Sequence, residues 1–296
     1  HDAWDIDHNF DQERTWEPGP AESVEVLERG PVRGVVRIVR RTEKSTFTQY
    51  LTLYACHPRI EVRLEVDWHE QRTLLKAAFP INVLTHRATY EIQFGTIERA
   101  THRNTELDRG RFEVPAQRWA DLSEGNYGAS LLNDCKYGYD VKDHLMRLSL
   151  LRGSIDPDPD ADQGRHEMVY ALYPHAGDWR NGTVQQAQSL NTPLLACATR
   201  ETRRGPLPAI DSFAATDAEN VFIEAVKKHE DSGAVILRLY EAHGQRGEVT
   251  LTFGSKPKRV RECDMMEEHG QPLKLKGHEL VLRVTPYEIR TLLVEF

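Results

Sequence analysis

Several patterns that define common protein classes are missing from this 296-residue chain. No apolar run approaches the length of about 18 residues that a membrane-spanning helix needs. Lysine-rich blocks are absent and the formal net charge is -8, so the basic surface of a nucleic-acid-binding protein is missing. Serine nucleophile elbows, P-loops and the GxGxxG fingerprint are absent as well. We therefore expect neither a membrane nor a nucleic acid as a partner.

Cysteine is also scarce. Cys56, Cys135, Cys197 and Cys263 lie far apart and form neither a CxxC pair nor a zinc-ribbon spacing. A chain of this length can bury a substantial core without disulfides. We therefore expect free thiols and a reducing compartment, the cytoplasm.

The pattern that is abundant is the period-two alternation of antiparallel strands. The run at 60–68 reads Ile-Glu-Val-Arg-Leu-Glu-Val-Asp-Trp. A helix would scatter these charges around its axis, so the run predicts a strand with one buried and one solvated face. On this prediction Ile60, Val62, Leu64 and Val66 are buried, and Glu61, Arg63 and Glu65 face water. Trp68 could stack on a sugar, but a core position is the favoured interpretation.

Strands are predicted along the whole chain, and helical periodicity is scarce. Only 181–190 has the composition of a short helix, and 228–233 is typical of a hairpin connection. The polar, proline-punctuated stretch 199–208 indicates a linker. We predict a large antiparallel β domain at 1–205 and a small β-sandwich at 206–296. The other predicted strands are 32–39, 47–54, 89–94, 128–133, 145–151, 168–172, 221–227, 234–240, 248–253, 258–263, 279–284 and 288–295.

The most conspicuous acidic cluster is Asp156-Pro-Asp-Pro-Asp-Ala-Asp162. Together with Glu167, its acids match the spacing of a calcium-binding loop. Ala161, however, stands where such a loop needs glycine for its sharp turn, and two prolines interrupt it. A solvated acidic loop is therefore the favoured interpretation, with calcium binding as the alternative.

Two other sets of residues could bind a metal. His229-Glu-Asp231 is the only His-x-Asp of the chain and lies in the predicted hairpin connection. Asp2, Asp5, Asp7 and His8 cluster near the start, where a surface segment packed against preceding polypeptide is the favoured interpretation. Because the chain starts at His1 rather than at Met, we expect it to belong to a longer polypeptide.

Several longer motifs resemble one family. They include ATYEIQFG at 88–95, RFEVPAQRWADLSE at 111–124, LLNDCKYGYD at 131–140, YALYPH at 170–175 and PYEIRTLL at 286–293. In order and along essentially the whole chain, they resemble the C-terminal β domains of family 38 α-mannosidases. The NDCKYG form is similar to the cytosolic subgroup. The resemblance implies an all-β fold, an antiparallel supersandwich of the galactose-mutarotase type followed by a small β-sandwich.

The resemblance also implies a function, and it implies which domain performs the catalysis. Family 38 enzymes of this subgroup are retaining α-mannosidases that act on mannose-containing oligosaccharides. Their aspartate nucleophile and divalent metal, zinc or cobalt, belong to an N-terminal catalytic domain. We therefore expect no catalytic residue, metal or cofactor in this chain. Its partner would be its own catalytic domain, which it would support while completing the substrate cleft.

One segment is the candidate for that cleft contact. In related mannosidases a loop with an acidic pair and then an arginine extends toward the active site. Here Asp160 and Asp162 match the acids and Arg165 the guanidinium, with His166 following. We expect Asp162 to orient Arg165; a surface ion pair is the alternative. Should this loop be structural, the next candidates are Asn133, Asp134 and Lys136.

A self-sufficient carbohydrate-active protein is the rival hypothesis. It could be a sugar-binding module or a mutarotase-like enzyme. A mutarotase needs a general acid and a general base that converge on one sheet face. The candidates for these roles are His102, His166 and Glu167.

Overall fold

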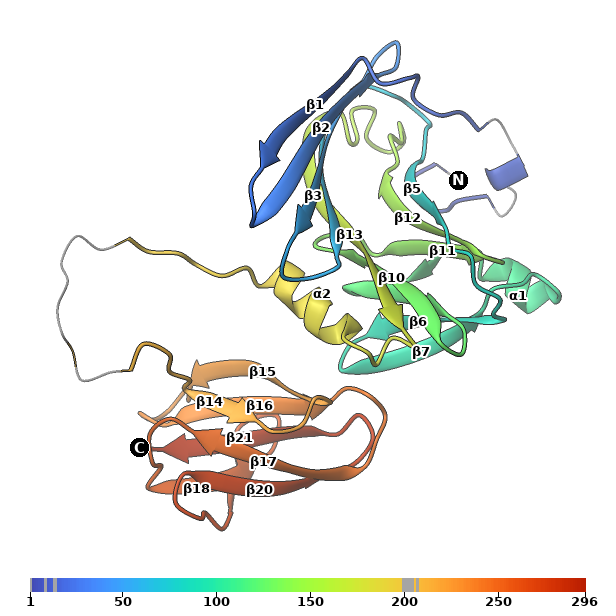
Figure 1. The fold of residues 1–296 in the computed structure, drawn as a ribbon. Coiled ribbons are helices and arrows are strands. Elements are labelled where there is room, and N and C mark those ends of the chain that lie inside the picture. The colour runs from blue at the N-terminus through green and yellow to red at the C-terminus, as the bar shows by residue number, and fades with distance from the viewer. Residues whose placement is uncertain (1, 8–9, 13–14, 199–204, 206–207) are drawn as a thin grey trace. The chain divides into compact units, whose positions relative to one another are not determined.

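The computed structural model describes residues 2–7, 10–12, 15–198, 205 and 208–296 (Figure 1). The chain divides into two compact units. The first comprises His1–Ile92 and Ile97–Pro193, and the second comprises Gln93–Thr96 and Leu194–Phe296. The predicted domain boundary at 205/206 falls in a stretch where 199–204 and 206–207 lie outside the described residues, and most of the predicted linker lies there too.

The first unit contains two sheets whose recorded pairings are antiparallel. The larger sheet has nine strands in the order β1-β2-β3-β4-β13-β10-β9-β6-β7, and the smaller has four in the order β5-β12-β11-β8. The nine strands are β1 (Ser23–Arg29), β2 (Arg33–Arg41), β3 (Thr46–Tyr54), β4 (Ile60–Trp68), β13 (Gly164–Ala176), β10 (Tyr127–Asn133), β9 (Trp119–Ser123), β6 (Arg87–Ile92) and β7 (Gly95–Ala100). The four are β5 (Leu75–Pro80), β12 (Leu145–Leu151), β11 (Gly138–Lys142) and β8 (Val114–Pro115).

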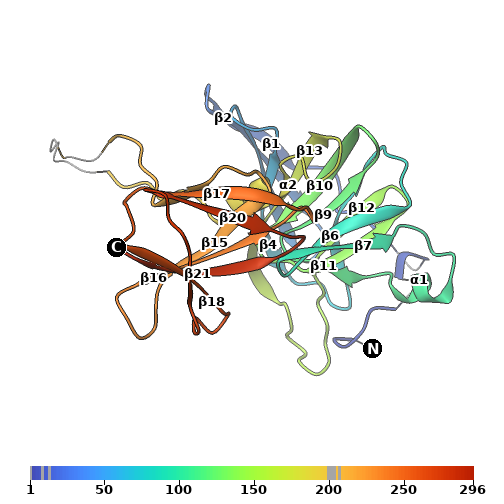
Figure 2. The same cartoon turned by 90° about the horizontal axis from the view of Figure 1, so that it is seen from below.

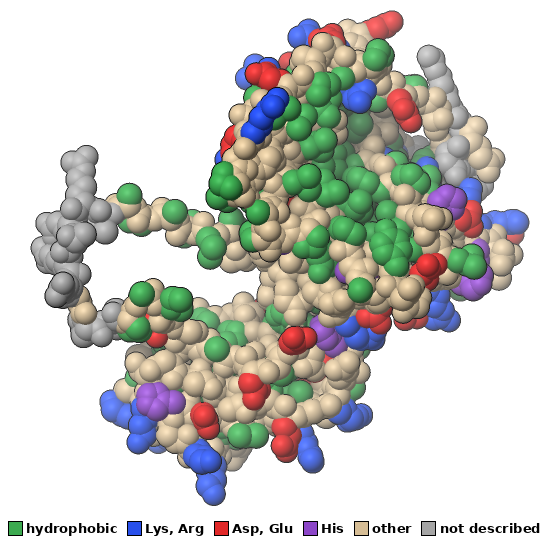
Figure 3. All heavy atoms as spheres, viewed as in Figure 1, with side chains coloured by type: hydrophobic (Ala, Val, Ile, Leu, Met, Phe, Trp, Pro, Cys, Tyr) green, Lys and Arg blue, Asp and Glu red, His purple; other side chains and the backbone are tan. Residues whose placement is uncertain are grey.

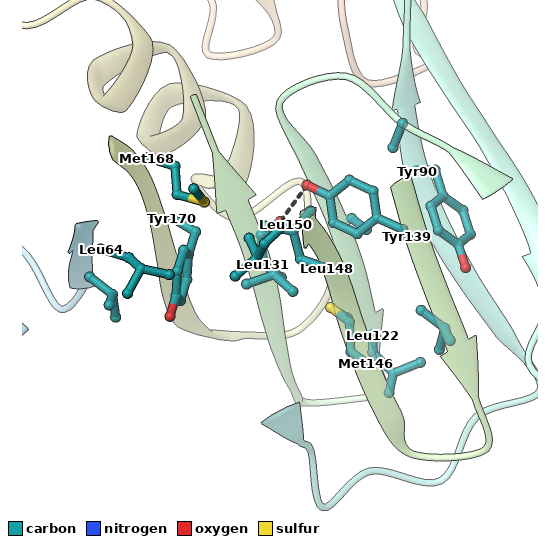
Figure 4. Packing of buried hydrophobic residues seen from close by; sticks show 14 of the residues in the cluster. Leu64, Tyr90, Leu122, Leu131, Tyr139, Met146, Leu148, Leu150, Met168 and Tyr170 are labelled. Carbon is teal, nitrogen blue, oxygen red and sulfur yellow. Dashed lines mark hydrogen bonds between the residues drawn. The ribbon is translucent and has the colours of Figure 1, made fainter. Parts of the chain in front are cut away.

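The core of the first unit lies between these two sheets. Leu64 and Met168 reach it from β4 and β13 of the larger sheet, and Met146 and Leu148 from β12 of the smaller one (Figure 4). All four side chains are at most 3% exposed. Tyr139 is fully buried with them, and its hydroxyl donates a hydrogen bond to a backbone carbonyl of β10. Apolar side chains that alternate along each strand therefore meet face to face, as the period-two pattern requires.

In the described part of the chain, three short helices accompany the sheets: the 3-10 helix η1 (Phe10–Gln12), α1 (Glu106–Gly110) and α2 (Thr183–Asn191). The last of these confirms the helix predicted at 181–190. It packs against β9 and β10 and buries Thr183, Val184 and Ala187 (Figure 2). Among the described residues, no helix has the length and hydrophobicity that crossing a membrane requires.

Strand β4 has the predicted bounds, but its polar face is more covered than predicted. Val62, Leu64 and Val66 are buried, whereas Ile60 is half-buried. Glu61 was expected in water, yet only 17% of its side chain is exposed, because the buried Arg59 forms an ion pair with it. Arg59 also donates to a backbone carbonyl of α2 at 2.7 Å. Arg63 and Glu65 were also expected in water. Both are half-buried, and their side chains form an ion pair with each other. Trp68 is fully buried, which confirms its core position.

The second unit is a sandwich of a three-stranded and a five-stranded sheet, in the orders β14-β17-β20 and β15-β16-β21-β18-β19. Its own core includes Leu237, Leu251 and Leu292, all fully buried. The predicted hairpin connection is confirmed, because the amide of His229 donates to the carbonyl of Ala234 at 2.9 Å. The predicted all-β antiparallel fold is therefore confirmed. The strands are β14 (Ala214–Thr216), β15 (Val221–Lys228), β16 (Val235–Glu241), β17 (Gly247–Phe253), β18 (Arg259–Cys263), β19 (Gln271–Pro272), β20 (Glu279–Val284) and β21 (Ile289–Glu295).

Candidate functional site: a polar groove on the large sheet

An open groove of about 380 Å³ lies across β3, β4 and β13 of the nine-stranded sheet. Its volume falls within the range of small-ligand sites. Most of the residues that border it carry a hydroxyl, a carboxylate or a guanidinium group. The residues around it are Thr46, Thr48, Glu65, Val66, Asp67, Arg165, His166 and Glu167.

The strand register explains why these side chains meet. Thr46 of β3, Asp67 of β4 and Arg165 of β13 form one row across the sheet. Successive side chains of a strand alternate between the two faces, so residues two apart project from the same face. The next row on that face therefore contributes Thr48, Glu65 and Glu167.

The two glutamates of the groove are neutralised from within the sheet. The guanidinium of Arg63 pairs with Glu65 and lies 3.5 Å from the carboxylate of Glu167. Its central carbon lies 3.9 Å from the ring centroid of Tyr50, which fixes its position. Burial opposes the charge of Arg63, but the two glutamates outweigh burial and raise its pKa. Arg63 thus lies between the two carboxylates that border the groove.

Arg165 differs from Arg63, because its side chain is exposed and, within the part of the chain that the structure describes, makes no hydrogen bond or ion pair. Asp67 stands beside it in the register, but the carboxylate of Asp67 instead contacts His69 Nε2 at 3.1 Å. The alternative of a surface ion pair for Arg165 therefore finds no support. Its guanidinium fork is available to an acceptor from outside the chain.

The expected partner of Arg165 serves another purpose. The carboxylate of Asp162 accepts hydrogen bonds from the backbone amides of Arg152 and Gly153, both at 3.0 Å. Partial burial raises the pKa of Asp162, but these two amide donors outweigh it, so its pKa lies below the ordinary value. The prediction that Asp162 orients Arg165 is therefore wrong. Asp162 ties its own turn to the end of β12 instead.

The other two predicted residues also differ in role. Asp160 is exposed in the turn before β13, where its carbonyl accepts from the amide of Gln163. His166 borders the groove, but strand alternation directs its ring to the opposite face from Arg165. There its Nε2 lies 2.7 Å from the carbonyl oxygen of Asp162. Of the four candidates, Arg165 alone presents its side chain to the groove.

The alternative candidates for the cleft contact, Asn133, Asp134 and Lys136, lie at and just after the end of β10. Asn133 is buried, accepts from the amide of Lys136 at 2.6 Å and donates to the hydroxyl of Tyr139. Asp134 accepts from the amide of Val169 in β13 at 3.1 Å. Lys136 lies close enough to Asp162 to help lower the pKa of that carboxyl. The two turns therefore lie near one another, and Asn133 has a structural role.

The opening segment makes hydrogen bonds with the residues that follow β12. The carboxylate of Asp2 accepts from the amides of Ile155 and Asp156, at 2.8 and 2.7 Å. These hydrogen bonds lower the pKa of Asp2. The carbonyl of Asp5 accepts from the guanidinium of Arg152. His8, the other member of the predicted cluster, lies outside the described residues.

The described ranges contain no group of three or more His, Cys, Asp or Glu side chains placed to hold a metal ion. The acids of the calcium-like loop do not converge. Asp158 accepts from the amide of Asp160, Asp162 is occupied by two amides, and Glu167 lies in the groove. In the hairpin, His229 Nδ1 contacts the hydroxyl of Ser232 at 2.9 Å instead of a metal-binding partner.

The proposed mutarotase residues do not converge either. His166 and Glu167 are adjacent on β13 and project from opposite faces of the sheet. His102 follows β7 and lies 3.5 Å from the carboxylate of Asp108 in α1. Strands β7 and β13 are four positions apart in the sheet, roughly 19 Å at the usual strand spacing. No acid–base pair can form from these three residues.

A buried polar network escaped the sequence analysis. Under α2, His175 Nε2 lies 2.7 Å from the carboxylate of Asp121 and 3.2 Å from the hydroxyl of Ser130, which also contacts Thr183. These residue types suggest a catalytic triad, but Asp121 and Ser130 contact the same ring nitrogen, so the histidine cannot relay a proton between them. A Cβ on Gly128 would lie 2.6 Å from His175 Cε1. The network joins β9, β10, β13 and α2, and no sequence spacing marks it.

The fold and the groove define an antiparallel β-sandwich module with an open polar site on one sheet. Known proteins make the assignment specific. The sequence matches the model of the "Glycosyl hydrolases family 38 C-terminal domain" at residues 1–160 and that of the family's "C-terminal beta sandwich domain" at 220–292. The chain belongs to glycosyl hydrolase family 38, as its motifs predicted, and comprises C-terminal domains of that family.

Curated relatives and a solved structure agree with this assignment. Human alpha-mannosidase 2C1 is 39% identical over 301 residues, which cover 99% of this chain and 29% of that protein. Alpha-mannosidase G of Dictyostelium discoideum is 34% identical over 90% of this chain and 25% of its own length. An alpha-mannosidase from Enterococcus faecalis V583 shares the fold, with a TM-score of 0.77 at 16% identity over 93% of this chain and 35% of its own. The chain spans less than a third of the length of these curated relatives.

Proposed function

We propose that this chain is the non-catalytic C-terminal portion of a cytosolic-type, retaining α-mannosidase that acts on mannose-containing oligosaccharides. The observation that carries the proposal is the match of 99% of the chain to 29% of a protein named alpha-mannosidase 2C1. Bond cleavage, with the nucleophile and a zinc or cobalt ion, then falls to a catalytic domain upstream. Four free cysteines, three of them exposed, support a reducing compartment such as the cytoplasm.

The groove is proposed to complete the substrate cleft of the intact enzyme. The free guanidinium of Arg165 can donate two hydrogen bonds to neighbouring sugar hydroxyls. Thr46 and Thr48 offer hydroxyls, and the carboxylates of Glu65 and Glu167, which lie beside Arg63, offer acceptors. Such a wall suits a polyhydroxylated ligand, because every sugar hydroxyl can both donate and accept.

Arg165→Ala in the intact enzyme tests this role. We expect catalytic efficiency to fall at least tenfold, about 1.4 kcal/mol in the transition state, with the melting temperature unchanged. The matched control is Arg283→Ala, which removes another exposed strand arginine, on β20, and should leave efficiency unaltered. Full activity of the Arg165 variant, or a loss that only follows lost stability, would mean that Arg165 does not contact the substrate.

The groove also favours one second candidate, an autonomous carbohydrate-binding module on a mutarotase-like supersandwich. Calorimetric titration of the isolated chain with a mannose oligosaccharide separates the two. Weak or absent binding supports a cleft shared with the catalytic domain, since the contacts from that domain would be missing. Tight binding by the isolated chain favours the module.

A further inference from the structure

Arg99, in the edge strand β7, carries a guanidinium group that is partly buried without an acceptor. Within the part of the chain that the structure describes, its buried Nη1 has no hydrogen-bond partner. Three other arginines have one buried nitrogen in this state, but each forms an ion pair through another nitrogen; they are Arg37, Arg147 and Arg261. Arg99 forms no ion pair among the described residues. Because a buried donor without an acceptor costs free energy, this position favours an acceptor from outside the chain.

The core beneath Arg99 holds its guanidinium in place. The central carbon of this group lies 4.7 Å from the ring centroid of Tyr90 in β6. Tyr90 belongs to the core of the first unit, is 2% exposed and packs edge-on against the buried Tyr139. A ring fixed in this way attracts and orients a cation over its face. Arg99 is therefore a positioned donor rather than a freely moving surface side chain.

A second arginine without an ion-paired acid lies nearby. Arg111 follows α1, is exposed and has no hydrogen bond or ion pair of its side chain in the described ranges. Burial lowers the pKa of Arg99, and the positive charge of Arg111 adds to this effect. An arginine side chain nonetheless keeps its proton in a protein. Two positive charges therefore lie near each other without a paired anion.

The acids around α1 are already occupied. In the space-filling view, side chains of both charges gather around this helix (Figure 3). The carboxylate of Asp108 accepts hydrogen bonds from the hydroxyl and the amide of Thr105, at 2.8 and 3.1 Å. These two bonds are the main cause of the lowered pKa of Asp108, and the charge of Arg111 contributes less. Glu106, the other acid of α1, forms an ion pair with Arg109. Neither acid of the helix pairs with Arg99 or Arg111.

We propose that Arg99 and Arg111 form a binding site for a phosphate group. Two guanidinium forks suit a phosphate, because it offers three strong acceptor oxygens and a carboxylate offers only two. Arg111 is exposed, which leaves the site open to solvent. The site is separate from the groove, because β7 and β13 are four positions apart in the sheet. It does not depend on the proposed function. Free inorganic phosphate and the phosphate of a monoester offer the same chemistry.

Calorimetric titration of the 296-residue chain with inorganic phosphate tests the site. We expect one site with a dissociation constant of roughly 1 mM or below, and a melting temperature that rises with phosphate concentration. Arg99→Gln and Arg111→Gln should each weaken binding about tenfold, through the loss of a charged hydrogen bond. Because Arg111 is exposed, its variant tests the site even if Arg99→Gln fails to fold. The matched control, Arg165→Gln, removes another unpaired arginine and should leave phosphate binding unchanged.

Several outcomes would overturn the proposal. Equal responses to chloride or acetate at the same ionic strength would exclude a site built for phosphate. Binding that only Arg165→Gln abolishes would place the anion in the groove instead. No saturable binding of phosphate would refute the site and leave Arg99 as a charge that guards the edge strand β7 against pairing with another sheet.

A second titration, with a hexose phosphate, separates the two sources of the phosphate group. Binding that is tighter than that of inorganic phosphate, and that Arg99→Gln weakens about tenfold, identifies a phosphate monoester as the ligand. Binding of equal strength identifies the free anion. A hexose phosphate that binds the Arg99→Gln and Arg111→Gln variants as tightly as the wild type would contradict the site.

Discussion

At the scale of single residues, the polar side chains near the groove divide by what they already bind. Asp162 and Asn133 are occupied by backbone amides of their own turns, whereas the side chain of Arg165 has no partner within the described residues. The sequence could select acids and arginines in one segment through the family resemblance. The sequence could not show which carboxylates accept hydrogen bonds from backbone amides, because that depends on the conformation of the turns. The role of Arg165 in the cleft stays a prediction.

The lowered pKa of Asp162 predicts a pH dependence of stability. A carboxyl with a depressed folded-state pKa stabilises the fold above its unfolded-state pKa, and this contribution is lost as the pH falls through the folded-state value. Asp162→Asn should therefore be less stable than the wild type at neutral pH, and the difference should shrink in acid. Urea unfolding at a series of pH values measures it, with Asp160→Asn, at an exposed turn position, as the control. A difference that stays constant down to acid pH would contradict the account.

At the scale of elements, a clear polar and apolar alternation, as in β4, allowed the bounds of a strand to be predicted from the sequence. β4 and β12 have the predicted bounds, and β13 extends further than predicted at both ends. β9 was missed because Asp121, in its middle, is 1% exposed, so no alternation is visible. Its charge is tolerated there because His175 and Ser130 bind it under α2. Pattern reasoning fails where a buried polar network replaces an apolar row.

The register of β4 can be tested directly. Leu64 is 3% exposed in the core, so Leu64→Asp should cost several kcal/mol of unfolding free energy, through lost apolar burial and a buried charge. Val226→Asp, at a strand position that is 55% exposed, is the control and should cost far less. Chemical denaturation of both variants measures the difference. A neutral result for Leu64→Asp would mean that the strand or its register is wrong.

At the scale of the whole molecule, each of the two units has a core of its own. Long ordered motifs were enough to predict the family, and the family implied the all-β fold. The groove could not be predicted, because it depends on how strands distant in sequence pair, and that pairing leaves no local pattern.

The central claim is that this chain supports a mannosidase without cleaving the bond itself. The direct test is an assay of the purified 296-residue chain with an aryl α-mannoside, in the presence and absence of added zinc or cobalt. A longer polypeptide that includes the upstream region serves as the positive control. The account predicts no turnover by the chain under any of these conditions and turnover by the longer polypeptide; metal-dependent turnover by a clean preparation of the chain alone would contradict it.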